Sequence, residues 1–246
     1  MPGILNVIGI GPGDPELLTL KALRIIKASP VLCVPKGREE GSSLALSIVE
    51  KAVDLKGKEI IEAHFPMVKT RSQGSGVRGQ GSQENGLDDK WDEIAETILG
   101  KLRKGVDVSF LTLGDPAVYS TFFYLYDRLL ELQPDLNIRI IPGVSSVNAA
   151  AARAGIYLGL GNDRIAILPA NYLDDLKPAL GSFDTVVLMK VSKVFNEILV
   201  LLSGMNLIEN AVCISRAGME DEKIFRNIKE MGEDDLNYFS IVIVKK

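Results

Sequence analysis

The stretch GILNVIGIGPGDPELLTLKA, residues 3–22, decides the fold class of this chain. Its first part, residues 3–10, is an apolar run that predicts a buried β-strand. An amphipathic helix is expected over residues 16–28, with apolar positions at Leu17, Leu20, Leu23 and Ile26. Glycines and prolines fill the turn between strand and helix, so backbone or a ligand is expected to approach closely there. A strand, a tight turn and a helix are typical of an α/β protein.

The same alternation of strands and helices runs along most of the chain. Apolar runs that predict strands lie at residues 31–34, 60–61, 106–111, 138–141, 164–168 and 185–189. Helical patterns lie at residues 43–53, 91–103, 120–132, 145–154, 172–180 and 193–202. Because such alternation builds parallel sheets, the fold class is α/β. We expect two α/β units with a boundary near residues 114–119, which gives an N-terminal domain over 1–116 and a C-terminal domain over 117–246.

Two segments depart from this alternation. Strand-like runs without long helices between them lie at residues 211–215, 223–228 and 240–244, which predicts an antiparallel edge. Residues 69–90 contain five glycines and almost no apolar side chain, so burial cannot offset the entropy of ordering them. We expect a mobile loop there, either an insertion or a lid that uses Arg71 and Arg78.

Composition limits the class of protein. The chain has 246 residues, of which 46% are apolar, enough for one large hydrophobic core or two small ones. Its net charge of -4 gives no basic surplus that would indicate nucleic-acid binding. No apolar run approaches the ~18 residues of a membrane span, and the N-terminal residues lack the positive charges of a signal peptide. We therefore expect a cytoplasmic protein with no nucleic-acid or membrane partner.

Residues that bind metals are few. Cys33 and Cys213 each lie in an apolar run, and their spacing fits neither a metal site nor a disulfide framework. We expect two buried thiols in a reducing compartment. With one histidine, His64, and no paired cysteines, we expect no metal site. His64 is expected on the surface or in a loop, although it could approach a metal carried by a substrate.

A dinucleotide-binding fingerprint is a competing interpretation of the first glycine turn. The third glycine of the G-x-G-x-x-G pattern is replaced by Asp14, whose carboxylate would repel a pyrophosphate. No acidic residue occurs about twenty positions past the turn, where the chain reads Ser29, Pro30, Val31 and Leu32. A nicotinamide-dependent dehydrogenase is therefore disfavoured, whereas a nucleotide-binding module without catalysis stays open.

A second glycine motif, LTLGDPAVYSTFFYL, occupies residues 111–125. Asp115 lies at the carboxyl end of a predicted strand, the place where open α/β sheets bind ligands. It could equally do no more than cap the turn. Tyr119 could orient a ligand or only pack, and Ser120 could cap the helix that follows.

A third motif, IPGVSSVNAAAARAG, occupies residues 141–155. Ser145 and Ser146 begin a helix of small residues, which would also suit close packing. Shorter signals of the same kind follow strands at residues 168–170, 189–191 and 215–218. Together these strand ends predict a wide cleft at one edge of the sheets.

These motifs, in this order, resemble those of the tetrapyrrole methylase family, the class III S-adenosylmethionine-dependent methyltransferases. GIGPGDPELLTLKA, LTLGDPAVYST, IPGVSS and the late SRAGM carry the resemblance, which spans nearly the whole chain. VPKGREEGSSLALSIV at 34–49 and YSTFFYL at 119–125 are similar to the precorrin-2 / cobalt-factor II C20-methyltransferases within that family. The segment 69–90 departs from that pattern, in which it is usually shorter.

The resemblance implies a fold of two α/β domains with S-adenosyl-L-methionine in the cleft between them, and a homodimer. It implies methyl transfer to carbon 20 of precorrin-2 or cobalt-factor II in cobalamin biosynthesis, with S-adenosyl-L-homocysteine as product. Carried over by motif position, the cofactor contacts are Pro12, Gly114, Asp115, Val118, Ser145, Ser146, Pro169, Met189 and Ala217. The alternative is methylation at another ring position, or of a protein residue as in diphthine synthase.

The chemistry of methyl transfer suggests roles for a few side chains. A sulfonium methyl group needs an electron-rich carbon held in line with it, so most of the catalysis is expected from positioning. Carbon 20 must also lose a proton, and we expect Asp115 as the base or charge partner and Tyr119 as a hydrogen-bonding orienter. The substrate carries many carboxylates, which makes Lys36, Arg38 and Arg71 the candidate substrate-binding residues, unless they only form a solvated basic surface.

Overall fold

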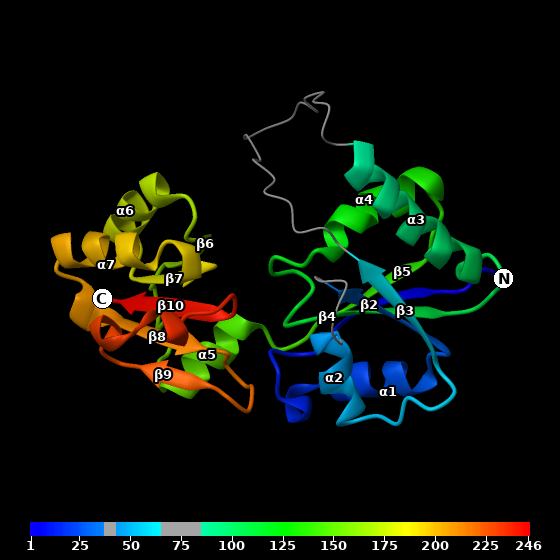
Figure 1. The fold of residues 1–246 in the computed structure, drawn as a ribbon, viewed down its shortest axis with the longest axis horizontal. Coiled ribbons are helices and arrows are strands. Elements are labelled where there is room, and N and C mark those ends of the chain that lie inside the picture. The colour runs from blue at the N-terminus through cyan, green and yellow to red at the C-terminus, as the bar shows by residue number, and fades with distance from the viewer. Residues whose placement is uncertain (37–42, 65–84) are drawn as a thin grey trace. The chain divides into compact units, whose positions relative to one another are not determined.

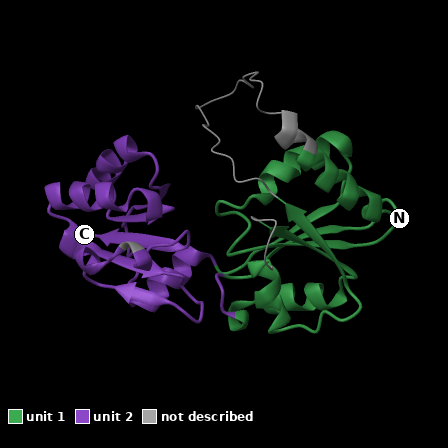
Figure 2. Cartoon of the chain, in the orientation of Figure 1, with its two compact units in different colours: residues 1–11, 15–144 green, residues 12–14, 145–246 purple. Residues whose placement is uncertain are grey.

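The structure is a computed structural model that describes residues 1–36, 43–64 and 85–246. The described chain separates into two compact units (Figure 2). Unit 1 comprises residues 1–11 and 15–144, and unit 2 comprises residues 12–14 and 145–246. Most of the expected loop over 69–90 lies outside the described residues, and helix α3 (Asn85–Leu102) begins within its last part.

Unit 1 is built on a five-stranded sheet in which every pairing is parallel. The strand order is β3-β2-β4-β1-β5. The strands are β1 (Leu5–Gly9), β2 (Val31–Lys36), β3 (Glu59–His64), β4 (Val108–Thr112) and β5 (Ile138–Ile141). The carboxyl ends of all five strands therefore lie at one edge of this sheet.

Helices cover both faces of the unit 1 sheet. Figure 1 shows α1 (Leu20–Ala28) and α2 (Leu44–Glu50) on one face, with α3 and α4 (Phe122–Leu132) on the other. Side chains of β1 alternate accordingly: Leu5 and Val7 join the core under α3 and α4, whereas Ile8 joins the core under α1 and α2. Strands buried on both faces explain why their sequences are continuous apolar runs.

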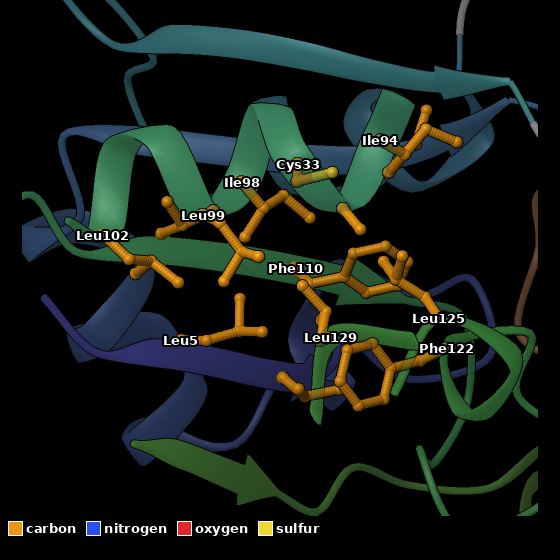
Figure 3. Packing of buried hydrophobic residues seen from close by; sticks show 14 of the residues in the cluster. Leu5, Cys33, Ile94, Ile98, Leu99, Leu102, Phe110, Phe122, Leu125 and Leu129 are labelled. Atoms are coloured by element: carbon orange, nitrogen blue, oxygen red, sulfur yellow. The ribbon is translucent and has the colours of Figure 1, made fainter. Parts of the chain in front are cut away.

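The core under α3 and α4 is filled by large side chains. Leu99 of α3, Phe110 of β4 and Phe122 of α4 are fully buried in it, and Figure 3 shows them packed in one layer with Leu5 of β1. The single tryptophan, Trp91, packs against this cluster from α3. Its fluorescence therefore reports on unit 1 alone.

The helix expected over residues 16–28 is shorter in the structure. Residues Pro15–Leu17 form a separate 3-10 turn, and α1 begins after Thr19, whose hydroxyl oxygen accepts a hydrogen bond from the Ala22 N–H at 3.1 Å. This cap sets the helix start at Leu20 and leaves the Leu20 side chain 84% exposed. The expectation that Leu20 contributes to the buried face is therefore wrong.

Unit 2 contains a mixed five-stranded sheet of order β6-β7-β10-β8-β9. Its strands are β6 (Ile165–Pro169), β7 (Thr185–Met189), β8 (Ala211–Ser215), β9 (Lys223–Phe225) and β10 (Ser240–Lys245). Strand β10 is antiparallel to both β7 and β8, so those two and β6 point the same way and their carboxyl ends share one edge. The expected antiparallel edge is present, because the edge strand β9 is antiparallel to β8. The antiparallel pairing also extends to β10 in the centre of the sheet, which the sequence did not indicate.

The helices of unit 2 also lie on both faces of its sheet. Figure 1 shows α6 (Leu173–Ser182) and α7 (Phe195–Gly204) on one face and α5 (Ser146–Ala154) on the other. The main core of this unit lies between the sheet and α6 and α7. Helix α5 contacts β8 and β10.

The domain boundary expected at residue 116 differs from the structure. Strand β5 pairs with β1, with Leu5 opposite Ile138, and Phe122 of α4 lies in the unit 1 core. Both elements follow residue 116 in sequence, yet unit 1 continues to Val144. The physical reason is that β5 adds to the edge of the first sheet, a long-range pairing that local sequence patterns do not reveal.

None of the helices in the described part of the chain is long and apolar enough to cross a membrane. Both cysteines are buried as expected, one in each unit. Burial raises the pKa of the Cys33 thiol and of the Cys213 thiol to about 12. Thiols with such pKa values are protonated and unreactive at neutral pH.

The packing of unit 1 predicts a contrast between two leucines. Leu99→Ala removes a fully buried side chain and should lower the free energy of unfolding of unit 1 by about 2–5 kcal/mol. Leu20→Ala changes an exposed leucine and should alter it by less than about 0.5 kcal/mol. Urea unfolding followed by Trp91 fluorescence measures both values. Equal effects of the two substitutions would contradict the burial assigned to these side chains.

Candidate functional site

The carboxyl ends of β4, β1 and β5, which are neighbours in the sheet, are held together by glycine backbone. The Gly114 N–H donates to the Gly11 carbonyl oxygen at 2.7 Å, and the Gly11 N–H donates to the Gly114 oxygen at 3.3 Å. A Cβ placed on Gly9 would lie 2.7 Å from the Gly114 oxygen and 2.7 Å from the Gly143 nitrogen. No side chain fits in that space, so glycine is required for the three loops to touch.

Asp115 links two of these loops through its carboxylate. Its Oδ1 atom accepts a hydrogen bond from the Ala117 N–H at 2.8 Å, and its Oδ2 atom accepts one from the Gly143 N–H at 2.9 Å. The first bond caps the turn after β4, an outcome that the sequence had left open. The second bond ties this turn to the loop after β5, so Asp115 fixes the shape of the edge whatever else it does.

Tyr119 lies in the same loop in an unusual backbone conformation. Its φ angle of 54° is in the left-handed region, which costs a residue with a side chain roughly 1–2 kcal/mol. The side chain is 48% exposed, and partial burial raises the pKa of its phenol above the ordinary value. The hydroxyl therefore stays protonated at neutral pH and can donate a hydrogen bond. Val118, the preceding residue, is half-buried.

Ser120 connects this loop to helix α4. Its hydroxyl oxygen accepts a hydrogen bond from the Phe122 N–H at 3.2 Å and lies 3.0 Å from the Thr112 hydroxyl at the end of β4. Ser120 was a candidate cap for this helix. In the structure Thr121 occupies the N-cap position without a side-chain bond, and Ser120, one residue earlier, binds the N–H of the first helical residue instead. The contact with Thr112 also holds the helix start at the carboxyl edge of the sheet.

In unit 2 the expected site residues follow strands that end at the same edge. Pro169 ends β6 and is paired with Met189 at the end of β7, and the Ala170 N–H donates to the Met189 oxygen at 2.8 Å. Ala217 follows β8 in a turn closed by a hydrogen bond from the Met219 N–H to the Arg216 oxygen at 2.9 Å. These ends are buried or half-buried and present mainly small or apolar groups.

Pro12 contacts the turn that contains Ala217. A Cβ placed on Gly218 would lie 3.2 Å from the Pro12 Cγ atom, and one placed on Gly13 would lie 3.1 Å from the Gly218 oxygen. The first glycine turn and the late SRAGM motif, which lie far apart in sequence, are therefore in direct contact. We refer to residues 216–219 below as the Ala217 turn.

Ser145 and Ser146 begin α5, also in unit 2. Ser145 is the N-cap residue, and its hydroxyl oxygen accepts a hydrogen bond from the Asn148 N–H at 3.2 Å. Both serines are half-buried. The structure thus gives Ser145 a capping role and leaves any ligand contact as a prediction.

The three expected substrate-binding residues have different outcomes. The Lys36 ammonium lies 2.7 Å from Oε2 of Glu62, and its side chain is only 12% exposed, so it has an internal partner that the sequence did not predict. Arg38 and Arg71 lie outside the described residues.

Near Glu62 is a cavity of about 460 Å³ between β3 and α3. Its lining residues are Ile61, Glu62, His64, Lys90, Glu93, Ile94 and Thr97.

The structure therefore groups the expected site residues by unit. Gly114, Asp115, Val118 and Tyr119 lie together in unit 1, and Pro12 lies beside the turn of Ala217 in unit 2. Sequence reasoning did not assign a role to Gly143, although its motif was recognised, and it overlooked Glu222, which binds the Gly218 N–H. No local signal marked Glu222. Within the described residues, no group of three or more metal-binding side chains is placed to hold a metal ion.

Known proteins resemble this chain along its whole length. It is 34% identical to a cobalt-precorrin-2 C(20)-methyltransferase of Salmonella typhimurium, over 100% of this chain and 98% of the relative. It is 33% identical to a probable cobalt-precorrin-2 C(20)-methyltransferase of Methanocaldococcus jannaschii, over 97% and 94%. A precorrin-2 C(20)-methyltransferase of Sinorhizobium sp. is 28% identical over 98% of this chain and 95% of its own length.

Solved structures share the fold of this chain. A cobalt precorrin-4 methyltransferase matches with a TM-score of 0.70 at 23% identity, over 98% of this chain and 94% of that one. A uroporphyrin-III C-methyl transferase of Thermus thermophilus, solved in complex with S-adenyl homocysteine, matches with a TM-score of 0.64 at 23% identity, over 99% and 98%. The expected fold of two α/β units is therefore confirmed.

The family model of the tetrapyrrole (corrin/porphyrin) methylases matches residues 5–231, which include the three glycine motifs and the late SRAGM motif. The relatives match the chain over its whole length, and the solved structures share its fold. The chain therefore belongs to the tetrapyrrole methylases.

Proposed function

We propose that this protein is an S-adenosyl-L-methionine-dependent methyltransferase that methylates carbon 20 of cobalt-precorrin-2 in cobalamin biosynthesis. One observation carries the proposal: relatives with that name match the chain from end to end, at 34% and 33% identity. The relative named for metal-free precorrin-2 is less similar, at 28% identity, which favours the cobalt-containing substrate. Another ring position, or a diphthine precursor, is not favoured, because these full-length relatives are named for carbon 20.

The described residues fit a cofactor of this kind. When bound, S-adenosylmethionine supplies a methyl group on a positively charged sulfur and leaves as S-adenosylhomocysteine. In unit 2, Pro169, Met189 and Ala217 offer small or apolar groups suited to the flat adenosine. Ser145 and Ser146, with Gly114, Asp115 and Val118 of unit 1, are the residues that we propose for the methionine part, and Pro12 supports the Ala217 turn.

The chain's own residues mainly orient the reactants in this proposal. Asp115 holds the loops at the edge of the unit 1 sheet and serves as the base or charge partner for the proton of carbon 20. Tyr119 presents a protonated hydroxyl on a half-exposed ring and orients the substrate. In this proposal Arg38 and Arg71 bind substrate carboxylates. Lys36 also binds one of them, while its ammonium keeps its ion pair with Glu62.

We further propose that the enzyme acts in the cytoplasm as a homodimer. Two buried cysteines, neither in a disulfide, suit a reducing compartment, and the family resemblance implies the dimer. Sedimentation equilibrium at micromolar concentration should give twice the mass of the chain. The mass of a single chain would contradict the dimer.

The proposed reaction predicts a specific product. We expect the purified protein, given cobalt-precorrin-2 and S-adenosylmethionine with a deuterated methyl group, to add one labelled methyl group, seen by mass spectrometry and placed at carbon 20 by NMR. Metal-free precorrin-2 should react more slowly. A label at another ring carbon would contradict the proposed position, and no transfer to either substrate would contradict the proposed substrate class.

The double contact of Asp115 predicts two separable effects of Asp115→Asn. The carboxylate accepts hydrogen bonds from both the Ala117 N–H and the Gly143 N–H, whereas an amide has one oxygen and can accept from only one of them. Unit 1 should therefore lose about 1–3 kcal/mol of stability. If the carboxylate also takes the proton, kcat should fall roughly 10²- to 10⁴-fold, with affinity for S-adenosylhomocysteine retained.

Asp54→Asn is the matched control, because Asp54 also accepts a backbone hydrogen bond in a turn, from the Lys56 N–H at 2.9 Å, but is exposed and outside the strand ends. Its kcat should equal that of the wild type. Unchanged turnover in Asp115→Asn would remove Asp115 from the chemistry and leave it as an anchor of the loops.

A further inference from the structure

Glu222 is an almost buried acidic residue close to the Ala217 turn. Its side chain is 9% exposed, and both carboxylate oxygens accept hydrogen bonds. Oε2 accepts from the Gly218 N–H at 2.7 Å, and Oε1 accepts from the Arg153 Nε–H at 2.6 Å. One carboxylate therefore joins the turn after β8 to the last turn of helix α5.

The Gly218 N–H lies at a point where the backbone needs support. Gly218 has a φ angle of 77°, a conformation that suits glycine, and it follows Arg216, whose φ angle of 57° is also left-handed. The left-handed Arg216 carries a conformational cost, and Gly218 brings backbone freedom that must be lost when the turn is fixed. A short bond from a backbone N–H to a charged acceptor is among the stronger ways to stabilise it.

The two segments that Glu222 joins are among those that the proposed function assigns to the cofactor in unit 2. Ala217 is 4% exposed and lies in the turn next to Gly218, with Pro12 packed against that turn. Helix α5 starts at Ser146 with Ser145 as its cap, and Arg153 lies in its last turn. A change at Glu222 would therefore reach both segments at once.

We propose that Glu222 is a positioning residue for cofactor binding: through Gly218 and Arg153 it holds the Ala217 turn against α5 in the shape that accepts adenosine. This inference rests on the proposed function, because it takes the Ala217 turn as part of the cofactor site. Glu222 does not touch the cofactor in this proposal.

The two bonds of Glu222 are expected to differ in strength. Arg153 is 60% exposed, so water screens its ion pair with Glu222 and competes for the guanidinium. The Gly218 N–H is half-buried, and a charged acceptor within the protein binds it more strongly. Loss of the Gly218 bond should therefore affect cofactor binding more than loss of the Arg153 bond.

The experiment measures the affinity of the full-length protein for S-adenosylhomocysteine by isothermal titration calorimetry, together with KM for S-adenosylmethionine and kcat. Glu222→Ala removes both bonds and should weaken binding and raise KM roughly tenfold or more, while kcat changes less than about threefold. Glu222→Gln keeps an oxygen for the Gly218 N–H and should recover most of the affinity. Arg153→Ala should weaken binding less than about threefold.

Lys223→Ala is the matched control, because Lys223 is adjacent in sequence and its ion pair with Asp235, at 2.8 Å, does not involve the Ala217 turn. It should bind as the wild type does. If Glu222→Ala does not fold, Glu222→Asp, which keeps the charge but is one methylene shorter, takes its place with the same expected loss of affinity.

The outcomes separate this inference from the proposed function. Wild-type protein that fails to bind S-adenosylhomocysteine would contradict the proposed function itself. If the wild-type protein binds and Glu222→Ala and Glu222→Asp bind with the wild-type affinity, the role of Glu222 is overturned, whereas the proposed function stands. A loss of affinity in Glu222→Gln as large as in Glu222→Ala would also overturn it, because the Gly218 bond would then not be what positions the turn.

Discussion

The contact of glycine backbone at the ends of β1, β4 and β5 is the constraint on which the rest of unit 1 depends. Gly9, Gly114 and Gly143 approach so closely that a single added Cβ would meet backbone atoms of the neighbouring loop. Such proximity is possible only because parallel strands deliver their carboxyl ends to one edge. The side chains of Asp115 and Tyr119 are displayed from loops whose positions these glycines fix.

Both units stabilise their strand-end loops with the same interaction, a hydrogen bond from a glycine N–H to a carboxylate. In unit 1 the Asp115 carboxylate accepts the Gly143 N–H, and in unit 2 the Glu222 carboxylate accepts the Gly218 N–H. In each case a charged side chain binds the backbone of a glycine that supports close packing or a left-handed turn. Glycine gives the loop its shape without steric cost, and the carboxylate compensates for the conformational freedom that glycine brings.

Sequence reasoning succeeded where structure follows from local patterns and failed where distant segments pair. The apolar runs predicted the strands of both sheets, and Ser145 and Ser146 were correctly expected to begin a helix. The domain boundary was wrong because β5 pairs with β1, across most of the length of unit 1. Leu20 was wrongly placed in the core, because it is the first residue of the helix after the Thr19 cap and the buried face consists of Ala22 and Ile26.

The sequence by itself determined the α/β class, the glycine turns and the family, because these depend on residue types at fixed short spacings. Tertiary structure alone decided that β10 lies between β7 and β8, that Lys36 is paired with Glu62, and that Glu222 holds the turn of Ala217. These features depend on which residues meet in space after the sheets form. Hydrogen bonds and ion pairs act over a few ångströms, and only the folded chain brings partners from distant segments within that range.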